Sequence, residues 1–258
     1  MKVQLLPSSF EQDGTPSKRQ HLTTLIIDDV VAFDAGSLGM AATPEHRTNL
    51  RDIVVSHAHL DHIAGLPLFI DDLFAILKEP VRIHASPDVI EVLEDHVFNW
   101  KIYPRFFELE NQFGPVMEYF EFEPNRRFEV RHLSVHPIEV NHRVPSCGFV
   151  IDDGRSVIAT TGDTAPTDIF WEQVGRTDNI SAVLVECAFP SSLGELASTS
   201  FHLTPSALSE ELEKLEPKGC RILVTNIKPA YREQTISEIN ALAIENLEIL
   251  EVGKVYEF

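Results

Sequence analysis

Short apolar runs that alternate with turn residues predict a chain rich in β-strands. Leu22–Ile27 and Val30–Asp34 flank Asp28-Asp29 and predict a hairpin, with Gly36 permitting a sharp exit. Further strands are predicted at Asp52–Val55, Val81–His84, Phe128–Leu133, Val135–Val140, Gly148–Asp152, Ser156–Thr161, Ala182–Glu186 and Arg221–Thr225, with Asp153-Gly154 as a second hairpin turn. The polar segment Ser8–Gln20 is expected to be a loop, and Glu108–Glu123 an insertion or connecting hairpin.

Helix signals lie between these strands. Ile63–Leu77 is mostly apolar, and Ser86-Pro87 and Thr204-Pro205 each place a capping residue before a proline, as at many helix starts. Apolar residues then recur at three- and four-residue spacing, as Leu208 and Leu212 do. Strand-rich halves with interspersed helices favour two sheets packed face to face with helices outside. Because no low-complexity linker or repeat divides the chain, residues 1–258 are expected to form a single domain.

A dense group of histidines follows the strand Asp52–Val55. The stretch VVSHAHLDHIAG holds His57, His59, Asp61 and His62 within six positions, although the chain has only 11 histidines. In an extended turn His57 and His59 project the same way and can share one metal. Asp61 and His62 aim at a neighbouring point as the chain enters a helix. The pattern suits two cations about 3.5–4 Å apart that are bridged by a water, as in enzymes that hydrolyse phosphate esters.

Three further polar residues follow the ends of predicted strands, where open α/β sheets keep their ligand sites. His142 lies in VNHRVPS, Asp163 in TTGDTAPTD and Asn226 in LVTNIKPAYRE. A single histidine in such a place is often structural. Together with the histidine cluster, however, His142 and Asp163 are predicted to be metal ligands.

The order HAHLDH, lone histidine, GDT and a last strand before KPAYR is similar to the metallo-β-lactamase superfamily. Within it, HAHLDHIAGL, HVFNWKIYP, NHRVPSCGF, GDTAPTDIFW and FHLTP resemble the class II 3′,5′-cyclic nucleotide phosphodiesterase branch. The resemblance extends from Leu22 to about Arg232. It implies an α/β fold, the αββα sandwich of two mixed β-sheets with outer helices, and a dinuclear metal centre at one edge.

The resemblance also implies a ligand set. Its members are His57, His59 and His142 on the first metal, Asp61 and His62 on the second, and Asp163 as the bridge between them. Asn226 is a departure, because the family normally has a histidine there on the second metal. Zinc is the expected ion, but an amide oxygen is a harder donor than imidazole. Asn226 is therefore compatible with manganese, magnesium or iron at the second site, with a single-metal enzyme, or with lost activity.

Charge narrows the range of partners. The net charge of −19, from 21 basic and 40 acidic side chains, disfavours long RNA or DNA. A small anionic phosphodiester can still bind, because bound cations dominate the local field. No apolar run approaches the about 20 residues of a membrane span, and MKVQLLPSSF becomes polar too soon for a secretory signal. Together with the scattered cysteines Cys147, Cys187 and Cys220, these features predict a cytoplasmic protein without a membrane partner.

The predicted reaction is hydrolysis of cAMP or cGMP to the 5′-nucleotide. A metal-bound water can attack as hydroxide near neutral pH. The departing 3′ oxygen needs a proton or a metal, and His202 in FHLTP is the candidate general acid. A helix cap is the structural alternative for His202. Asp61 is assigned to the catalytic residues as well as to the ligands.

Other readings of the same motifs stay open. A tRNA 3′-end nuclease would need a basic arm, whereas Glu108–Glu123 is acidic. A lactonase or thioester hydrolase would use the same hydroxide on a carbonyl, and a degenerate member, which Asn226 alone favours, would bind metal or nucleotide without turnover. The aromatic segment His96–Phe107 is interpreted as core, as a homodimer contact or as a platform for a nucleobase.

Overall fold

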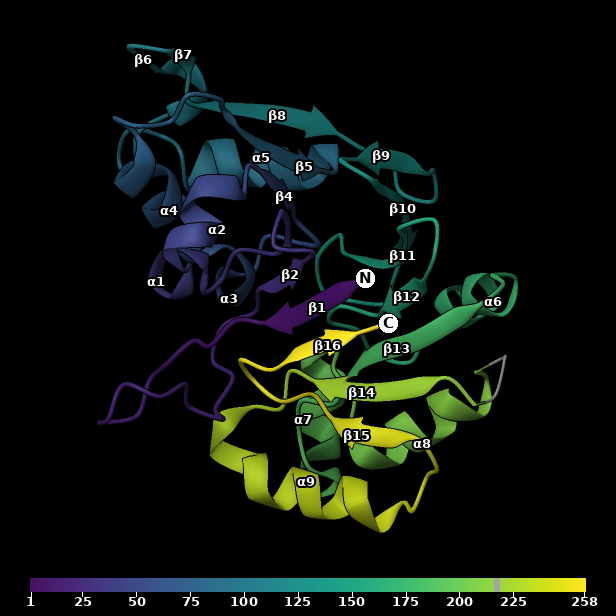
Figure 1. The fold of residues 1–258 in the computed structure, drawn as a ribbon. Coiled ribbons are helices and arrows are strands. Elements are labelled where there is room, and N and C mark those ends of the chain that lie inside the picture. Colours follow the sequence, from purple (N-terminus) through teal and green to yellow (C-terminus); the bar gives the residue numbers. More distant parts are fainter. Residues whose placement is uncertain (216–218) are drawn as a thin grey trace. The chain divides into compact units, whose positions relative to one another are not determined.

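The first predicted hairpin forms as β2 (Leu25–Ile27) and β3 (Val31–Phe33), which pair antiparallel. Asp28 and Asp29 at its turn have φ of 49° and 62°, which Asp tolerates better than most residues. The computed structural model describes residues 1–215 and 219–258 (Figure 1). These divide into two compact units. Unit 1 comprises residues Met1–Lys18, Leu22–Glu123 and Val252–Glu257, and unit 2 comprises Arg19–His21, Pro124–Glu251 and Phe258.

Within the described residues, unit 1 is built on a seven-stranded mixed sheet in the order β16-β1-β2-β3-β4-β5-β8. Pairing is antiparallel from β16 to β3 and parallel from β3 to β8. Its other strands are β1 (Lys2–Leu5), β4 (Asp52–Val54), β5 (Val81–Ala85), β8 (Met117–Glu121) and β16 (Val255–Glu257). Its helices are α1 (Leu38–Ala41), α2 (Pro44–Asn49), α3 (Leu60–Ile63), α4 (Gly65–Leu73) and α5 (Pro87–His96), followed by a 3-10 turn at Phe106–Glu108.

One prediction for unit 1 needs correction, and another is confirmed. Glu108–Glu123 is more than a connecting hairpin: the pair β6 (Glu110–Asn111) and β7 (Gly114–Pro115) is a small hairpin, but β8 joins the main sheet parallel to β5. The predicted start of α5 is confirmed: Ser86 is the N-cap residue and Pro87 lies in the first turn, although the Ser86 side chain makes no capping hydrogen bond.

The aromatic segment His96–Phe107 serves the core of unit 1 in part. Phe98 and Phe106 are buried among the apolar residues of β4, β5, α4 and α5. Trp100 and Ile102, in contrast, are 57% and 68% exposed. The core interpretation is therefore confirmed for the two phenylalanines, and the dimer contact and the nucleobase platform stay predictions.

Among the described residues of unit 2, a second seven-stranded mixed sheet has the order β15-β14-β13-β12-β11-β10-β9. Pairing is antiparallel from β9 to β12 and parallel from β12 to β15, and Figure 1 shows β13, β14 and β15 as neighbouring arrows. The strands are β9 (Phe128–Val130), β10 (Leu133–Glu139), β11 (Cys147–Asp152), β12 (Val157–Thr160), β13 (Ile180–Glu186), β14 (Arg221–Thr225) and β15 (Leu247–Ile249). The helices are α6 (Ile169–Gly175), α7 (Gly194–Ser200), α8 (Pro205–Glu213) and α9 (Arg232–Ala241).

The local signals of unit 2 are mostly confirmed. Thr204 caps α8 by accepting a hydrogen bond from the Ala207 amide, and Pro205 occupies the first turn. Leu208 and Leu212 on α8 are buried against the sheet core. The predicted strand Phe128–Leu133 is wrong as one element, since a turn at Arg131, with φ of 55°, separates β9 from β10.

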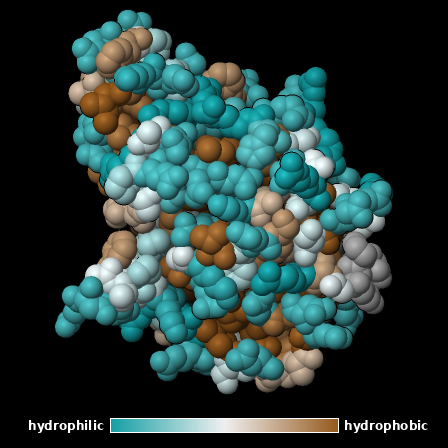
Figure 2. Space-filling view, viewed as in Figure 1, coloured by the Kyte–Doolittle hydropathy of each residue, from teal (hydrophilic) through white to brown (hydrophobic). Residues whose placement is uncertain are grey.

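The sheets place the predicted site residues at strand ends, as expected. The parallel strands β4, β12 and β14 run directly into the segments that carry His57, Asp163 and Asn226. No helix in the described parts of the chain combines the length and apolar character needed to cross a bilayer. Figure 2 shows one face, on which hydrophilic residues predominate and hydrophobic residues form several separate groups.

Candidate metal centre

The histidine cluster of unit 1 begins just beyond the carboxyl end of β4. His57 and His62 are almost fully buried, and His59 is the N-cap residue of α3. The His57 ring centroid lies 4.1 Å from that of His62 and 4.8 Å from that of His59. Nε2 of His57 is 3.2 Å from Nδ1 of His59. Two nitrogens on one tetrahedral zinc are about 3.3 Å apart for bonds of about 2.0–2.1 Å, so this spacing fits a shared metal.

Asp34, at the end of β3, orients two of these histidines. Its Oδ2 atom lies 2.7 Å from His62 Nδ1 and accepts a hydrogen bond of 2.9 Å from Ser56 Oγ, while Oδ1 accepts from the Ser56 amide at 2.8 Å. Because a carboxylate only accepts, Ser56 Oγ donates to it and accepts in turn from His57 Nδ1 at 2.9 Å. These bonds engage Nδ1 of both histidines and fix their rings, the usual second-layer support of a metal site.

Asp61, the fourth residue of the predicted cluster, is half-buried on α3, and its carbonyl accepts a hydrogen bond of 2.8 Å from the Thr23 amide. Gly36 lies directly against this contact. A Cβ at Gly36 would come within 1.9 Å of the Asp61 carbonyl oxygen and 2.8 Å of the Thr23 nitrogen. The glycine is therefore needed for the close approach of α3, and its role exceeds the sharp exit predicted from sequence.

We expect Gly36→Ala to weaken both the fold and metal binding. The new methyl must push α3 aside, and with it the predicted ligands Asp61 and His62, at a cost of about 1–3 kcal/mol for overpacking. Thermal unfolding and metal content measured on the purified variant test this. Gly194→Ala is the matched control, because a Cβ there meets nothing within 4 Å. Equal melting temperatures and equal metal contents for the two variants would contradict the expectation.

In unit 2, His142 follows β10 and is held by a backbone carbonyl. Its Nδ1 donates a hydrogen bond of 3.0 Å to the oxygen of Phe201, a residue with φ of 59° at the end of α7. This bond engages Nδ1 and fixes the His142 ring. The His142 ring lies 5.3 Å from the ring of His202.

Asp163 and Asn226 meet in unit 2 beyond the ends of β12 and β14. Both are buried, and Asn226 Nδ2 donates to Asp163 Oδ1 at 2.6 Å. Asn226 has φ of 56°, and its backbone amide donates a hydrogen bond of 2.9 Å to Gln20 Oε1. Its Oδ1 lies 3.5 Å from Lys228 Nζ. The amide nitrogen, which is a donor only, thus faces the carboxylate, and Asn226 would have to turn its amide to present oxygen to a metal.

His202 is paired with a carboxylate that sequence reasoning did not single out. Glu186, at the end of β13, is fully buried and lies 2.8 Å from His202 Nδ1; it also accepts from the amides of Thr164 at 2.8 Å and Leu203 at 3.2 Å. Burial raises the pKa of Glu186, and the adjacent His202 opposes that rise. For His202, burial lowers the pKa, but Glu186 outweighs it and the pKa is raised overall.

Each unit thus gathers part of the predicted site. Unit 1 brings together His57, His59 and His62, and unit 2 brings together His142, His202, Asp163 and Asn226. Ligand atoms of Asp163, Glu186 and His202 all lie within 4.8 Å of one another, so this group also has donors for a cation. Asp34 and Glu186 were not singled out from the sequence as residues of the site. The only feature in the sequence that could have indicated each of them is a single carboxylate at the end of an apolar strand.

A family model described as "Beta-lactamase superfamily domain" matches residues 24–224, most of the chain. The chain belongs to the beta-lactamase superfamily. The family predicted from HAHLDH, the lone histidine and GDT is thereby confirmed, and with it the assignment to a superfamily of hydrolases.

The chain is also similar to individual members of this superfamily. A probable 3′,5′-cyclic-nucleotide phosphodiesterase of Yersinia pestis is 25% identical over 213 residues, which are 72% of this chain and 60% of that protein. The chloroplastic tRNase Z TRZ2 of Arabidopsis thaliana is 28% identical over 136 residues, which are 51% of this chain and 34% of that protein. The chain therefore spans less than two thirds of the length of either relative.

The crystal structure of unliganded yeast PDE1 superposes with a TM-score of 0.77 at 19% identity, over 98% of each chain. This likeness, with two mixed sheets and their helices, confirms the predicted metallo-β-lactamase fold class. The prediction of a single domain over residues 1–258 stays a prediction.

Proposed function

We propose that this beta-lactamase superfamily member is a metal-dependent phosphodiesterase that hydrolyses 3′,5′-cyclic nucleotides to 5′-nucleotides. The observation that carries the proposal is the gathering of imidazoles and carboxylates at strand ends in each unit, with the Nδ1 atoms of His57, His62 and His142 each in a hydrogen bond. Similarity to the Yersinia pestis protein supports the substrate class. The net charge of −19 favours a small anion over a polyanion.

The proposed metal ligands are those implied by the family resemblance: His57, His59, Asp61, His62, His142, Asp163 and Asn226. Neutral imidazole and carboxylate are donors that zinc accepts, and the amide of Asn226 is better suited to manganese or magnesium. Bound at these residues, such ions supply Lewis acidity and lower the pKa of water toward about 7.

His202 is the proposed general acid for the departing 3′ oxygen. Glu186 occupies its Nδ1, so the proton to be transferred is carried on Nε2, the other nitrogen of the ring. Glu186 itself acts as a positioning residue, because it fixes the ring and is anchored by the Thr164 and Leu203 amides. Asp61, also assigned to catalysis, is proposed to act from α3.

A tRNA 3′-end nuclease is the second candidate, favoured by the similarity to tRNase Z TRZ2. A substrate panel with defined metals separates the two: cyclic AMP, cyclic GMP, a linear phosphodiester, a short RNA and a lactone. The proposal expects cleavage of a cyclic nucleotide with the highest kcat/KM. RNA cleavage without cyclic-nucleotide cleavage would favour the nuclease, and bound nucleotide without turnover would favour a non-catalytic member.

Substitutions of Asn226 are expected to change how tightly the protein binds metal. We expect Asn226→His to raise zinc affinity at one site, and Asn226→Ala to lower metal affinity there, by about tenfold each, because imidazole is a better zinc donor than an amide and alanine donates nothing. Elemental analysis after dialysis against buffered zinc is the measurement. Asn240→His on the exposed face of α9 controls for an added surface histidine. If neither substitution at position 226 changes the metal content, Asn226 is not a metal ligand.

The remaining expectations about partners and place are part of the proposal. The substrate is a small anionic phosphodiester, and the exposed Trp100 and Ile102 are the residues through which a homodimer would form. Cytoplasmic location stays a prediction from composition.

A further inference from the structure

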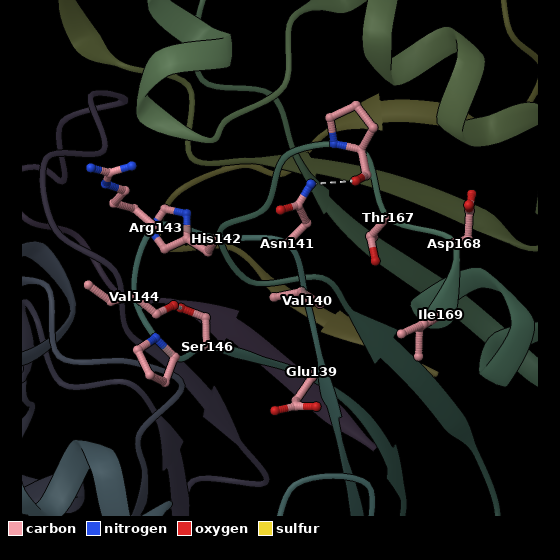
Figure 3. A pocket seen from close by; sticks show the side chains of 12 residues that line it. Glu139, Val140, Asn141, His142, Arg143, Val144, Ser146, Thr167, Asp168 and Ile169 are labelled. Atoms are coloured by element: carbon pink, nitrogen blue, oxygen red, sulfur yellow. Dashed lines mark hydrogen bonds between the residues drawn. The ribbon is translucent and has the colours of Figure 1, made fainter.

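Unit 2 holds a pocket of about 540 Å³ beside His142 (Figure 3). It is lined by the segment 139–146, which begins at the last residue of β10, and by the segment 166–169, which ends at the first residue of α6. A cavity of this size is in the range of about 300–1,000 Å³ that accommodates small ligands. One lining residue, His142, is a proposed metal ligand, so the pocket opens beside the proposed chemistry.

The two walls of the pocket are fixed to each other and to the fold. Asn141 Nδ2 donates to the Pro166 oxygen at 2.9 Å, and the Ala165 amide donates to the Asn141 oxygen at 2.7 Å. The Thr167 amide donates at 2.9 Å to Glu211 Oε2, a buried carboxylate that also accepts from Trp171 Nε1 at 2.7 Å. A pocket held in this way needs little rearrangement to bind a ligand.

Thr167 presents an unused hydroxyl to this pocket. The residue is only 7% exposed, and its Oγ1 has no hydrogen-bond partner within residues 1–215 and 219–258. Figure 3 shows the hydroxyl directed into the space between Val140 and Ile169. The atom is not among the fully buried unpaired ones, so it is reached from the pocket, where a ligand can form a hydrogen bond with it.

The lining also differs from side to side. Figure 3 shows His142 and Arg143 on one side and Thr167, Asp168 and Ile169 on the other, with Glu139 also in the lining. Both carboxylates have partners, because Asp168 accepts from Lys214 Nζ at 2.6 Å and Glu139 accepts from Asn125 Nδ2 at 3.4 Å. Arg143 forms no ion pair with any carboxylate in the described residues, and Ile169 is 53% exposed. One side therefore suits an anionic group, and the other suits a flat apolar body that carries hydrogen-bonding atoms.

We propose that this pocket binds the nucleoside part of the phosphodiester, with the base against Val140 and Ile169, a hydrogen bond to Thr167 Oγ1, and the phosphate toward Arg143. This inference rests on the proposed function and names the specificity pocket of the same site. A nucleotide has the required polarity, because its phosphate is anionic and its base is flat, largely apolar and edged with donors and acceptors.

The test compares Thr167→Val with Thr177→Val in the full chain as purified. Both remove a hydroxyl and keep the shape, but the Thr177 hydroxyl donates to the Gln173 carbonyl away from the pocket. We expect Thr167→Val to weaken 5′-AMP binding in calorimetry, and to raise KM for cyclic AMP, about five- to tenfold. Its melting temperature should not fall, because the lost hydroxyl had no partner. Thr177→Val should bind 5′-AMP as the wild type does.

A second pair keeps the test independent of one hydroxyl. Ile169→Glu should weaken 5′-AMP binding more than tenfold, while Leu196→Glu, at a 43% exposed position on α7, should not. Cyclic AMP hydrolysis with KM unchanged in both pocket variants would overturn the pocket and leave the proposed function standing. The opposite result is also possible: Thr167→Val and Ile169→Glu both weaken 5′-AMP binding, but the protein hydrolyses no cyclic nucleotide. That result would support the pocket and overturn the proposed function.

Discussion

Replacing His202 by alanine is expected to lower kcat by about 10²–10⁴-fold while metal content stays near that of the wild type. The side chain contacts Glu186 and lies 4.0 Å from Asp163, but it is not in the proposed ligand set. Its loss removes the proposed proton donor for the 3′ oxygen and leaves the proposed metal ligands in place. Steady-state kinetics on cyclic AMP with elemental analysis of the same preparation provide the measurement.

Two variants make that result interpretable. His132→Ala removes an exposed histidine from the turn between β9 and β10 and should change neither quantity. Glu186→Gln keeps an acceptor beside Nδ1 but removes the charge, so a smaller fall in kcat than for His202→Ala is expected. Losses of metal and of activity that run in parallel in His202→Ala would show that His202 is a ligand or a fold element.

The histidine cluster could be predicted because its signal is local. His57, His59, Asp61 and His62 lie within six positions directly after an apolar strand, so composition and strand position together indicate a metal site. His142 and Asp163 were predictable more weakly, since each is one polar residue at a strand end. They could be predicted as metal ligands only from their order in the chain relative to the histidine cluster.

Asp34 and Glu186 could not be assigned because their partners are distant in sequence. Asp34 contacts His62 at a separation of 28 residues, and Glu186 contacts His202 at a separation of 16. A carboxylate that ends an apolar strand is visible in the sequence, but pairing it with a histidine requires the sheet order. The sequence therefore supplies the proposed ligands more readily than the groups that orient them.

Several strands were missed for the same reason. β1 pairs with β2 and with β16, which lies at the other end of the chain. The sequence near Lys2–Leu5 therefore does not indicate which strands pair with it. β8 carries acidic residues and becomes a strand by pairing parallel with β5. Such strands depend on tertiary pairing more than on their own propensity.

Asp34→Asn is expected to lower metal affinity about 10–100-fold, the usual effect of losing a residue that orients a metal ligand. Asp34 accepts three hydrogen bonds through two oxygens, from Ser56 N, Ser56 Oγ and His62 Nδ1. Asparagine keeps the shape and tolerates the φ of 60° at this position, but it exchanges one acceptor oxygen for a donor. One of the three donors then loses its acceptor, and the ring of His57 or His62 is no longer held in its orientation.

Asp29→Asn is the matched control for this change. Asp29 has a similar φ of 62° in the same unit, and its carboxylate lies near His46, which is outside the proposed ligand set. Competition with a chromogenic chelator gives the metal affinity of each variant, and thermal unfolding reports any loss of structure. A fall in affinity confined to Asp34→Asn, with similar melting temperatures, would assign the effect to orientation of His57 and His62. Equal affinities in the two variants would mean that these imidazoles bind metal without help from Asp34, and that the carboxylate serves the hairpin alone.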